Sequence, residues 1–162
     1  MTMKAPGFRF LIAHPAHFIA LGFGAGLSPF APGTVGTLVA LPLDALLRAT
    51  LGDAGYAIAT VLAFVVGIPA ADRTGRDLGA ADHGAIVWDE IVAFLAILYF
   101  VGADPVRQAF AFLLFRIFDV VKPPPAGAID RRWHHGFGVM ADDLVAAGYT
   151  LLMLALWTRL AG

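Results

Sequence analysis

Two pairs of adjacent acidic residues stand out in a chain that is otherwise rich in apolar residues. Asp89 and Glu90 lie near the start of one expected helix, and Asp142 and Asp143 lie near the start of another. One acidic side chain is enough to cap a helix, so the second one in each pair calls for another partner. Carboxylate oxygens are the usual protein ligands of hard divalent cations. We therefore expect these acids to bind a metal ion.

Each of these acids also has an ordinary structural explanation. Asp82 could cap the helix that follows it, and it lies seven residues before Asp89, close to the same helical face. Asp89 and Glu90 could be a polar pair at a membrane interface, and as sequence neighbours they are not expected to point the same way. Asp142 and Asp143 could simply favour the positive end of a helix dipole.

Arg116, Asp119 and Lys122 form a stripe of alternating charge, because they are spaced three residues apart at the end of an apolar helix. The ordinary explanation is an internal salt bridge whose side chains reach toward a membrane interface. The functional interpretation is that Asp119 fixes Arg116, while Arg116 and Lys122 hold the oxygens of an anion.

The segment GTVGT, at residues 33–37, leads into an expected helix that Thr34 would cap. Backbone N–H groups at a helix start can bind phosphate, so Thr34 and Thr37 are candidate phosphate-binding residues, although most such loops are only helix caps. His134 could donate a proton to a leaving oxygen. We expect His135 to be an interfacial residue.

Together, these groups suit metal-assisted attack on a phosphate ester, with the cations offsetting the charge on the phosphoryl group. The nucleophile could be an activated water or a carboxylate, and the residues leave this open. The chain has no Cys, which excludes a cysteine nucleophile and Cys-ligated zinc. A net charge of −1 gives no basic excess, so nucleic acid is not an expected partner.

The elements that position these residues are expected to be apolar helices. Hydrophobic residues make up 59% of the chain and charged residues 14%, and the mean hydropathy is +0.78. An ordinary soluble domain has roughly 25% charged residues. The composition, without any strand-like alternation or repeat, predicts an all-α bundle of about six membrane-embedded helices. The length of 162 residues predicts one domain, residues 1–162.

Five strong helices are expected, each followed by a polar, Gly-containing or Pro-containing segment. They cover Val35–Leu51, Ala54–Ala71, Ile86–Val101, Val106–Val121 and Asp143–Leu160. The weaker segment Phe8–Gly26, which contains Pro15, could span a membrane or lie at its interface.

If each strong helix crosses a membrane once, the loops at Thr34, 72–84 and 122–141 lie on one side. That side holds most of the cationic residues, namely Arg73, Arg76, Arg116, Lys122, Arg131 and Arg132. The far side holds Arg48, Arg107 and Arg159. The positive-inside rule then predicts that the polar loops face the cytoplasm.

Four segments together resemble the bacterial phosphatidylglycerophosphatase A family. They are GLSPFAPGTVGTL (26–38), DHGAIVWDE (82–90), FRIFDVVKP (115–123) and IDRRWHHGFGVMADD (129–143), in the order of the family. The resemblance implies an all-α, Mg²⁺-dependent enzyme that removes phosphate from phosphatidylglycerophosphate at the membrane and leaves phosphatidylglycerol. The residues at motif positions are Asp82, Asp89, Glu90, Arg116, Asp119, Lys122, Asp130, Asp142 and Asp143.

The resulting hypothesis is a multi-pass lipid phosphatase of the bacterial inner membrane with its active site facing the cytoplasm. Its partners are the phospholipid substrate and the membrane, and the oligomeric state is left open. The expected catalytic residues are Asp89, Glu90, Asp119, Asp143 and His134. The expected phosphate-binding residues are Arg116, Lys122, Thr34 and Thr37. The expected Mg²⁺ ligands are Asp82, Asp89, Glu90, Asp142 and Asp143, not all of which need bind directly.

Three alternatives compete with this hypothesis. A small cation transporter or channel would place acids at mid-membrane depth on several helices, whereas only Asp44 lies well inside an expected helix. A non-catalytic membrane scaffold would leave the acidic pairs unexplained. An enzyme of the same type could act on another lipid phosphate, such as phosphatidic acid.

Overall fold

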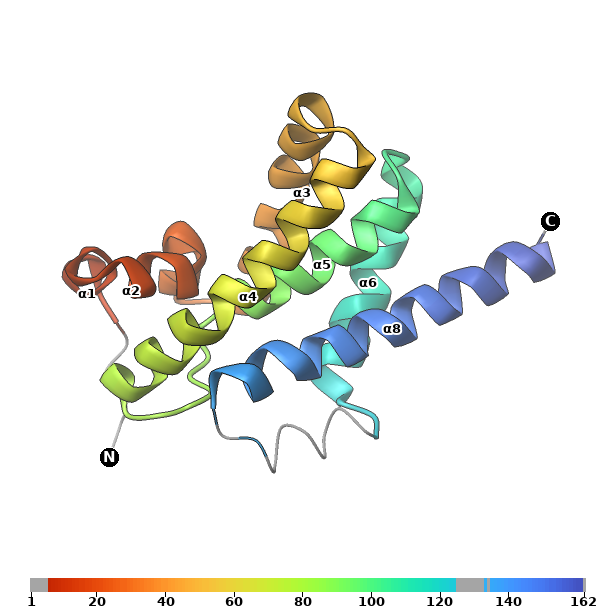
Figure 1. Cartoon of the computed structure of the whole chain (residues 1–162). Coiled ribbons are helices and arrows are strands. Elements are labelled where there is room, and N and C mark those ends of the chain that lie inside the picture. The colour runs from red at the N-terminus through yellow and green to blue at the C-terminus, as the bar shows by residue number, and fades with distance from the viewer. Residues whose placement is uncertain (1–5, 125–132, 134, 162) are drawn as a thin grey trace.

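The computed structural model describes residues 6–124, 133 and 135–161, and in these residues the chain forms helices and no strands (Figure 1). The all-α prediction is therefore confirmed for the described part. Two short helices, α1 (Phe8–Ala13) and α2 (Pro15–Ala20), precede a 3₁₀ segment, η1 (Gly22–Leu27). The longer helices are α3 (Pro32–Thr50), α4 (Asp53–Leu78), α5 (Trp88–Val101), α6 (Pro105–Val121) and α8 (Gly136–Ala161).

Helix α5 is the centre of the bundle. Its sequence is apolar on all sides after the first turn, and a helix of this kind is stable only when it is surrounded. Helices α3, α4, α6 and α8 all pack against it. Phe94 of α5 is fully buried and stacks on Phe115 of α6, with ring centroids 5.7 Å apart. The 14 residues of α5 span about 21 Å, less than the ~30 Å of a bilayer core.

The segment 8–26 does not form one continuous helix. His14 has an extended backbone between α1 and α2, and Phe23 has a positive φ of 60° inside the 3₁₀ segment. Helix α2 packs along α4, where buried His17 contacts Asp77 at 2.8 Å. Each of the two short helices has six residues, or about 9 Å, so neither spans a membrane.

Two expected polar loops are partly helical. Helix α4 continues to Leu78, and α8 begins at Gly136, seven residues before the expected start. A methyl group on Gly136 would collide with the Ile68 carbonyl and lie 2.8 Å from Asp72 Cβ, so the missing side chain lets α8 begin against α4. Asp142 and Asp143 therefore lie well inside α8, and the helix-cap explanation for them is wrong.

Two other expected caps are also wrong. Ala31 is the N-cap of α3, which starts at Pro32, so Thr34 lies within the first turn and does not cap the helix. Val87 is the N-cap of α5, so Asp82 does not cap this helix either. The remaining helix boundaries agree with the expected ones within a few residues.

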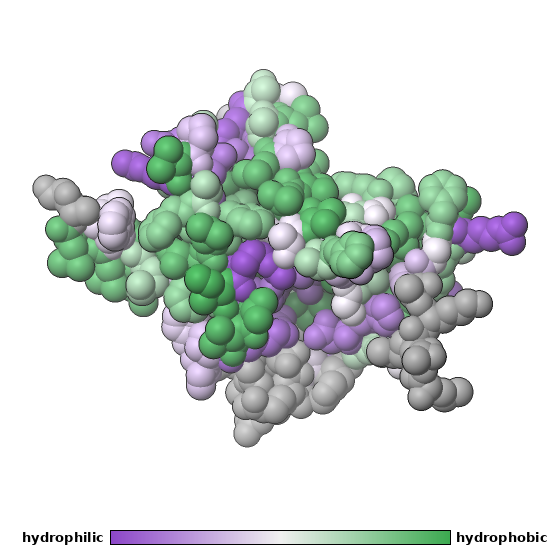
Figure 2. Space-filling view, turned by 180° about the vertical axis from the view of Figure 1, so that it is seen from behind, coloured by the Kyte–Doolittle hydropathy of each residue, from purple (hydrophilic) through white to green (hydrophobic). Residues whose placement is uncertain are grey.

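In the described part of the chain, α4 and α8 are long and apolar enough to cross a membrane. Only 22% of the apolar stretch of α4 and 39% of that of α8 is buried inside the bundle, so most of both stretches faces outward. Figure 2 shows hydrophobic surface over much of one face, with hydrophilic surface in separate patches. Exposed apolar surface on this scale is typical of a protein that contacts lipid. Crossings by the other helices stay a prediction.

Candidate functional site

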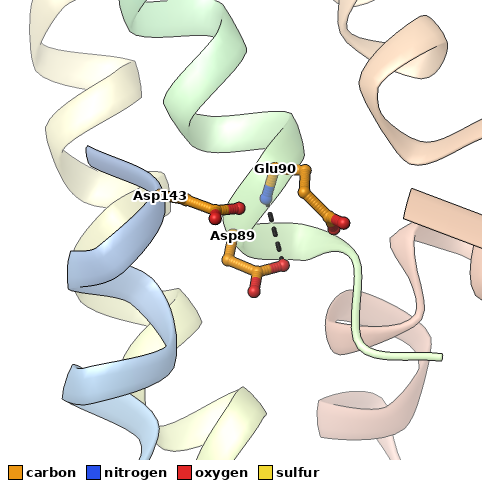
Figure 3. A group of neighbouring side chains, drawn as sticks. All are labelled: Asp89, Glu90 and Asp143. Carbon is orange, nitrogen blue, oxygen red and sulfur yellow. Dashed lines mark hydrogen bonds between the residues drawn. The ribbon is translucent and has the colours of Figure 1, made fainter. Parts of the chain in front are cut away.

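Three carboxylates meet where the start of α5 packs against α8 (Figure 3). One oxygen each of Asp89, Glu90 and Asp143 lies within 4.8 Å of the other two, so we call these residues the carboxylate group. Asp89 and Asp143 are buried, and the Glu90 side chain is 13% exposed. Asp89 Oδ1 accepts a hydrogen bond of 3.0 Å from the Glu90 N–H. The side chains of Asp89 and Glu90 point in different directions, as expected for sequence neighbours, yet one oxygen of each stays within 4.8 Å of the other (Figure 3).

Burial makes the charged form of these acids costly. It raises the pKa of Asp89 well above its ordinary value, and the nearby charge of Glu90 raises it further. Burial also raises the pKa of Glu90 to about 7. Three neighbouring carboxylates in a buried place must share protons or face a cation. The group therefore has the composition of a site for a hard divalent cation.

Unused oxygen atoms support the same interpretation. Among the described residues, Glu90 Oε2 and Asp143 Oδ2 are buried and accept no hydrogen bond. A buried carboxylate oxygen without a partner is unfavourable, so each of these atoms is suited to a ligand. One oxygen comes from α5 and the other from α8, as a site between two helices requires.

Arg116 of α6 borders the carboxylate group. Its Nη1 lies 2.6 Å from Asp119 Oδ2 and 3.5 Å from Glu90 Oε1, and it donates to Thr37 Oγ1 at 3.4 Å. The Arg116 side chain is only 19% exposed. Asp119 and Thr37 thus orient the guanidinium group beside the carboxylates.

The start of α3 closes another side of the site. Gly33 packs directly on Glu90, because a methyl group there would collide with Glu90 Oε1 and lie 3.2 Å from Arg116 Nη2. Thr37 is fully buried and donates to the Gly33 carbonyl at 2.8 Å. Sequence reasoning missed the role of Gly33; its signal was the spacing of Gly33 and Gly36 on one face of α3, which allows close helix contact.

Lys122 forms the centre of a second cluster. Its Nζ lies 2.6 Å from Asp142 Oδ2 and 3.9 Å from Asp82 Oδ2. Asp142 is buried, whereas the Asp82 side chain is 51% exposed. The five expected metal ligands therefore divide into the carboxylate group and two acids beside Lys122.

Of four remaining expected residues, the structure describes two, Thr34 and His135. Thr34 is half-buried in the first turn of α3. His134 and Asp130 lie outside the described residues, so the role of His134 stays a prediction. His135 is exposed, with its ring 6.3 Å from that of Trp133.

The polar loops expected on one side of the chain do meet at one end of the bundle. The start of α3 contacts Glu90 through Gly33. Lys122 bridges the end of α6 to Asp82 and Asp142, and Gly136 donates its N–H to Asp72 Oδ1 at 3.3 Å. Segments far apart in sequence thus share one polar region.

Comparison with known proteins gives a consistent result. Residues 18–158 match the sequence family described as phosphatidylglycerophosphatase A. The chain is 38% identical to phosphatidylglycerophosphatase A of Haemophilus influenzae, over 95% of both chains. It is 39% identical to phosphatidylglycerophosphatase A of Escherichia coli, over 85% of this chain and 80% of the relative.

A third relative carries a different name. The chain is 36% identical, over 94% of its length and 96% of the relative, to a Bacteroides thetaiotaomicron protein whose provisional name is phosphatidylinositol-3-phosphatase. No solved structure matches. The extent of the family match and of the first two relatives is decisive: the chain belongs to the phosphatidylglycerophosphatase A family of enzymes.

Proposed function

We propose that the chain is a Mg²⁺-dependent phosphatase that hydrolyses phosphatidylglycerophosphate to phosphatidylglycerol and phosphate at the bacterial inner membrane. The observation that carries this proposal is the buried carboxylate group with Arg116 at its edge. The substrate is inferred from the names of two relatives that match most of the chain. Cation-binding acids beside a fixed guanidinium are the parts that phosphomonoester hydrolysis needs.

Asp89, Glu90 and Asp143 would hold the metal, since the two unused oxygens belong to this group. A bound Mg²⁺ would polarise the phosphoryl group and offset its negative charge. Arg116, held by Asp119, would donate hydrogen bonds to a phosphoryl oxygen in a water-poor place where such bonds are strong. Lys122 would attract the phosphate, although it also neutralises Asp142.

Hydrolysis also requires proton transfer. Water forms the new bond to phosphorus while the bond to the glycerol oxygen breaks, so the water loses a proton and the glycerol oxygen gains one. We propose Glu90, at the edge of the carboxylate group beside Arg116, as the acceptor of the first proton. His134 is our candidate donor of the second. A carboxylate nucleophile remains the alternative to water.

The membrane setting is part of this proposal. The exposed apolar stretches of α4 and α8 support contact with lipid. Arg73, Arg76, Arg116 and Lys122 lie toward the end of the bundle that holds the site, and this distribution favours a cytoplasmic orientation. We propose a multi-pass arrangement in which the phosphate group reaches the site from the cytoplasmic leaflet.

The transporter alternative loses its best residue. Asp44 is buried and is not part of the carboxylate group, and it accepts hydrogen bonds from Arg48 at 2.9 Å and Tyr56 at 2.8 Å. Because hydrogen-bond donors already occupy this carboxylate, it is poorly suited to bind a transported ion. The name of the Bacteroides relative favours a second candidate, a phosphoinositide substrate for the same site.

The test compares phosphate release by purified protein from phosphatidylglycerophosphate, phosphatidic acid and phosphatidylinositol 3-phosphate, with Mg²⁺ or EDTA. We expect release from phosphatidylglycerophosphate that depends on Mg²⁺ and is lost in Asp89→Asn and Asp143→Asn. Asp53→Asn, an exposed acid at the start of α4, is the matched control. Equal release by all variants, or equal release in EDTA, would contradict the proposed site. Preference for another lipid would change the substrate and leave the site intact.

A further inference from the structure

An apolar groove of about 400 Å³ runs between α3 and α6. Both helices pack against α5, and Phe112 lies edge-on against Phe94 of α5 with ring centroids 5.9 Å apart. Leu38 is 47% exposed and Leu113 is 59% exposed, so the groove opens outward. Its walls are formed mainly by Leu38, Leu41, Ala109, Phe112 and Leu113.

The end of this groove at Arg116 leads to the site. Arg116 follows Leu113 by three residues and Phe112 by four, so the three lie along one face of α6. Thr37 precedes Leu41 by four residues on α3. The hydrogen bond between Arg116 and Thr37 therefore joins the two walls at this end, and the same guanidinium lies 3.5 Å from Glu90.

The opposite end of the groove, at Gln108, is also polar. Gln108 Nε2 donates to the Gly102 carbonyl at 2.8 Å and to Asp44 Oδ2 at 3.3 Å, which links α6 to α3. From Gln108 to Arg116 the helix rises about 12 Å. Between these two polar links, the walls offer only hydrocarbon contacts to an occupant.

We infer that this groove binds one acyl chain of the lipid substrate, an inference that rests on the proposed function. The phosphomonoester would lie at the carboxylate group, and the terminal glycerol and the phosphodiester that follow it would lie near Arg116. The first part of one acyl chain, which begins at the second glycerol, would lie between α3 and α6. A groove of about 12 Å can hold only part of an acyl chain, and the remainder of the chain would extend into the bilayer. Continuity with Arg116 is what selects this occupant over an unrelated apolar partner.

Another groove provides a useful contrast. A cavity of about 200 Å³ is lined by Phe100, Leu154 and Ala155. Ala155 lies twelve residues beyond Asp143 on α8, or about 18 Å along the helix. This cavity is lined mainly by apolar side chains, together with Arg107 and Thr158, and has no such link to the site, so filling it should not affect substrate binding.

The test fills each groove with a large side chain at an exposed alanine. Ala109→Leu and Ala109→Trp form a graded series, and Ala155→Trp is the matched control. Each protein is assayed with diacyl phosphatidylglycerophosphate in mixed micelles and with the deacylated headgroup, glycerophosphoglycerophosphate. We expect Ala109→Trp to raise KM for the diacyl lipid by about tenfold, the scale of steric discrimination in apolar pockets. Its activity on the deacylated compound and all activities of Ala155→Trp should stay unchanged.

A second measurement uses wild-type protein and a phosphatidylglycerophosphate that carries a photoreactive diazirine on one acyl chain. We expect cross-links in residues 38–41 and 109–113, and we expect Ala109→Trp to remove them. Equal effects of the two tryptophan variants, equal loss on both substrates, or cross-links spread evenly over α4 and α8 would overturn the inference. Wild-type protein that releases phosphate from neither compound would instead contradict the proposed function.

Discussion

Gly33 of α3 lies directly against the carboxylate of Glu90 on α5, and the space between them is too small for a methyl group. This contact sets the position of Glu90 Oε1, and through it the distance to Arg116. Because Gly33 has no side chain, α3 can approach α5 closely enough to fix the position of the Glu90 carboxylate.

Gly33→Ala should therefore lower activity more than stability. The methyl group would displace Glu90, and a shift of about 1 Å at a catalytic group can cost ~100-fold in rate. Gly148→Ala is the matched control, because it is a helical glycine with open space around it. We expect a large loss of kcat for Gly33→Ala, and unchanged kcat with a slightly raised Tm for Gly148→Ala. Similar kcat values for both variants would show that Glu90 has room to move.

The raised pKa of Glu90 predicts a pH dependence of stability without metal. The ordinary value is 4.5 and the folded value about 7, so the folded state holds its proton more tightly than the unfolded state. Its contribution to stability is full below pH 4.5 and is lost as the pH rises to about 7. Glu90→Gln should flatten this decline, as measured by thermal unfolding in EDTA between pH 4.5 and 8.

Mg²⁺ should act in the opposite direction over the same range. The metal competes with protons for the carboxylates, so the rise in Tm caused by Mg²⁺ should grow as the pH increases. Asp143→Asn should reduce this rise, and Asp53→Asn should retain it. A Mg²⁺ effect that is independent of pH, or equal in both variants, would place the metal elsewhere.

Substitutions in the partly buried pair of Arg116 and Asp119 should lower activity, whereas the same kind of change in an exposed ion pair should not. Arg116→Lys keeps the charge but loses the planar geometry, so we expect kcat/KM to fall by about 100-fold. Asp119→Asn should cost less, on the order of tenfold, because Thr37 still orients the guanidinium. Arg107→Lys is the control, since Arg107 forms an exposed pair with Asp104 at the same spacing as Arg116 and Asp119. Equal losses at Arg107 and Arg116 would indicate a general effect of charge.

The helices were predictable because apolar runs and their polar breaks are local features of the sequence. The extension of α4 to Leu78 was missed, although its signal was present. Arg76 pairs with Asp72 and Arg73 pairs with Asp77, both four residues apart, which is the spacing that supports a helix. Polar composition alone therefore suggested a loop where the charge pattern favoured a helix.

The grouping of the acids was less predictable. Asp142 and Asp143 are sequence neighbours, but one residue turns a helix by about 100°. Asp143 consequently faces Asp89 and Glu90, while Asp142 faces Lys122. Which of the two faces α5 depends on how α8 rotates and crosses the bundle. That rotation is set by tertiary packing, including the contact of Gly136 with α4. It therefore could not be predicted from local patterns in one sequence.

The hydrogen bond between Tyr56 and Asp44 leads to a prediction in which stability changes and activity does not. Tyr56 is almost completely buried, and its hydroxyl donates to Asp44 at 2.8 Å. Tyr56→Phe would leave the buried carboxylate with one donor fewer, which typically costs about 1–3 kcal/mol of unfolding free energy.

Because neither Tyr56 nor Asp44 belongs to the carboxylate group, kcat at low temperature should not change in Tyr56→Phe. Tyr99→Phe tests the same chemical change in the neighbouring ring, for which only ring contacts are described. Denaturant unfolding and phosphate release measured on the same samples would separate the two effects. A Tyr56→Phe variant that keeps its stability but loses activity would mean that Asp44 takes part in function, and the transporter alternative would regain support.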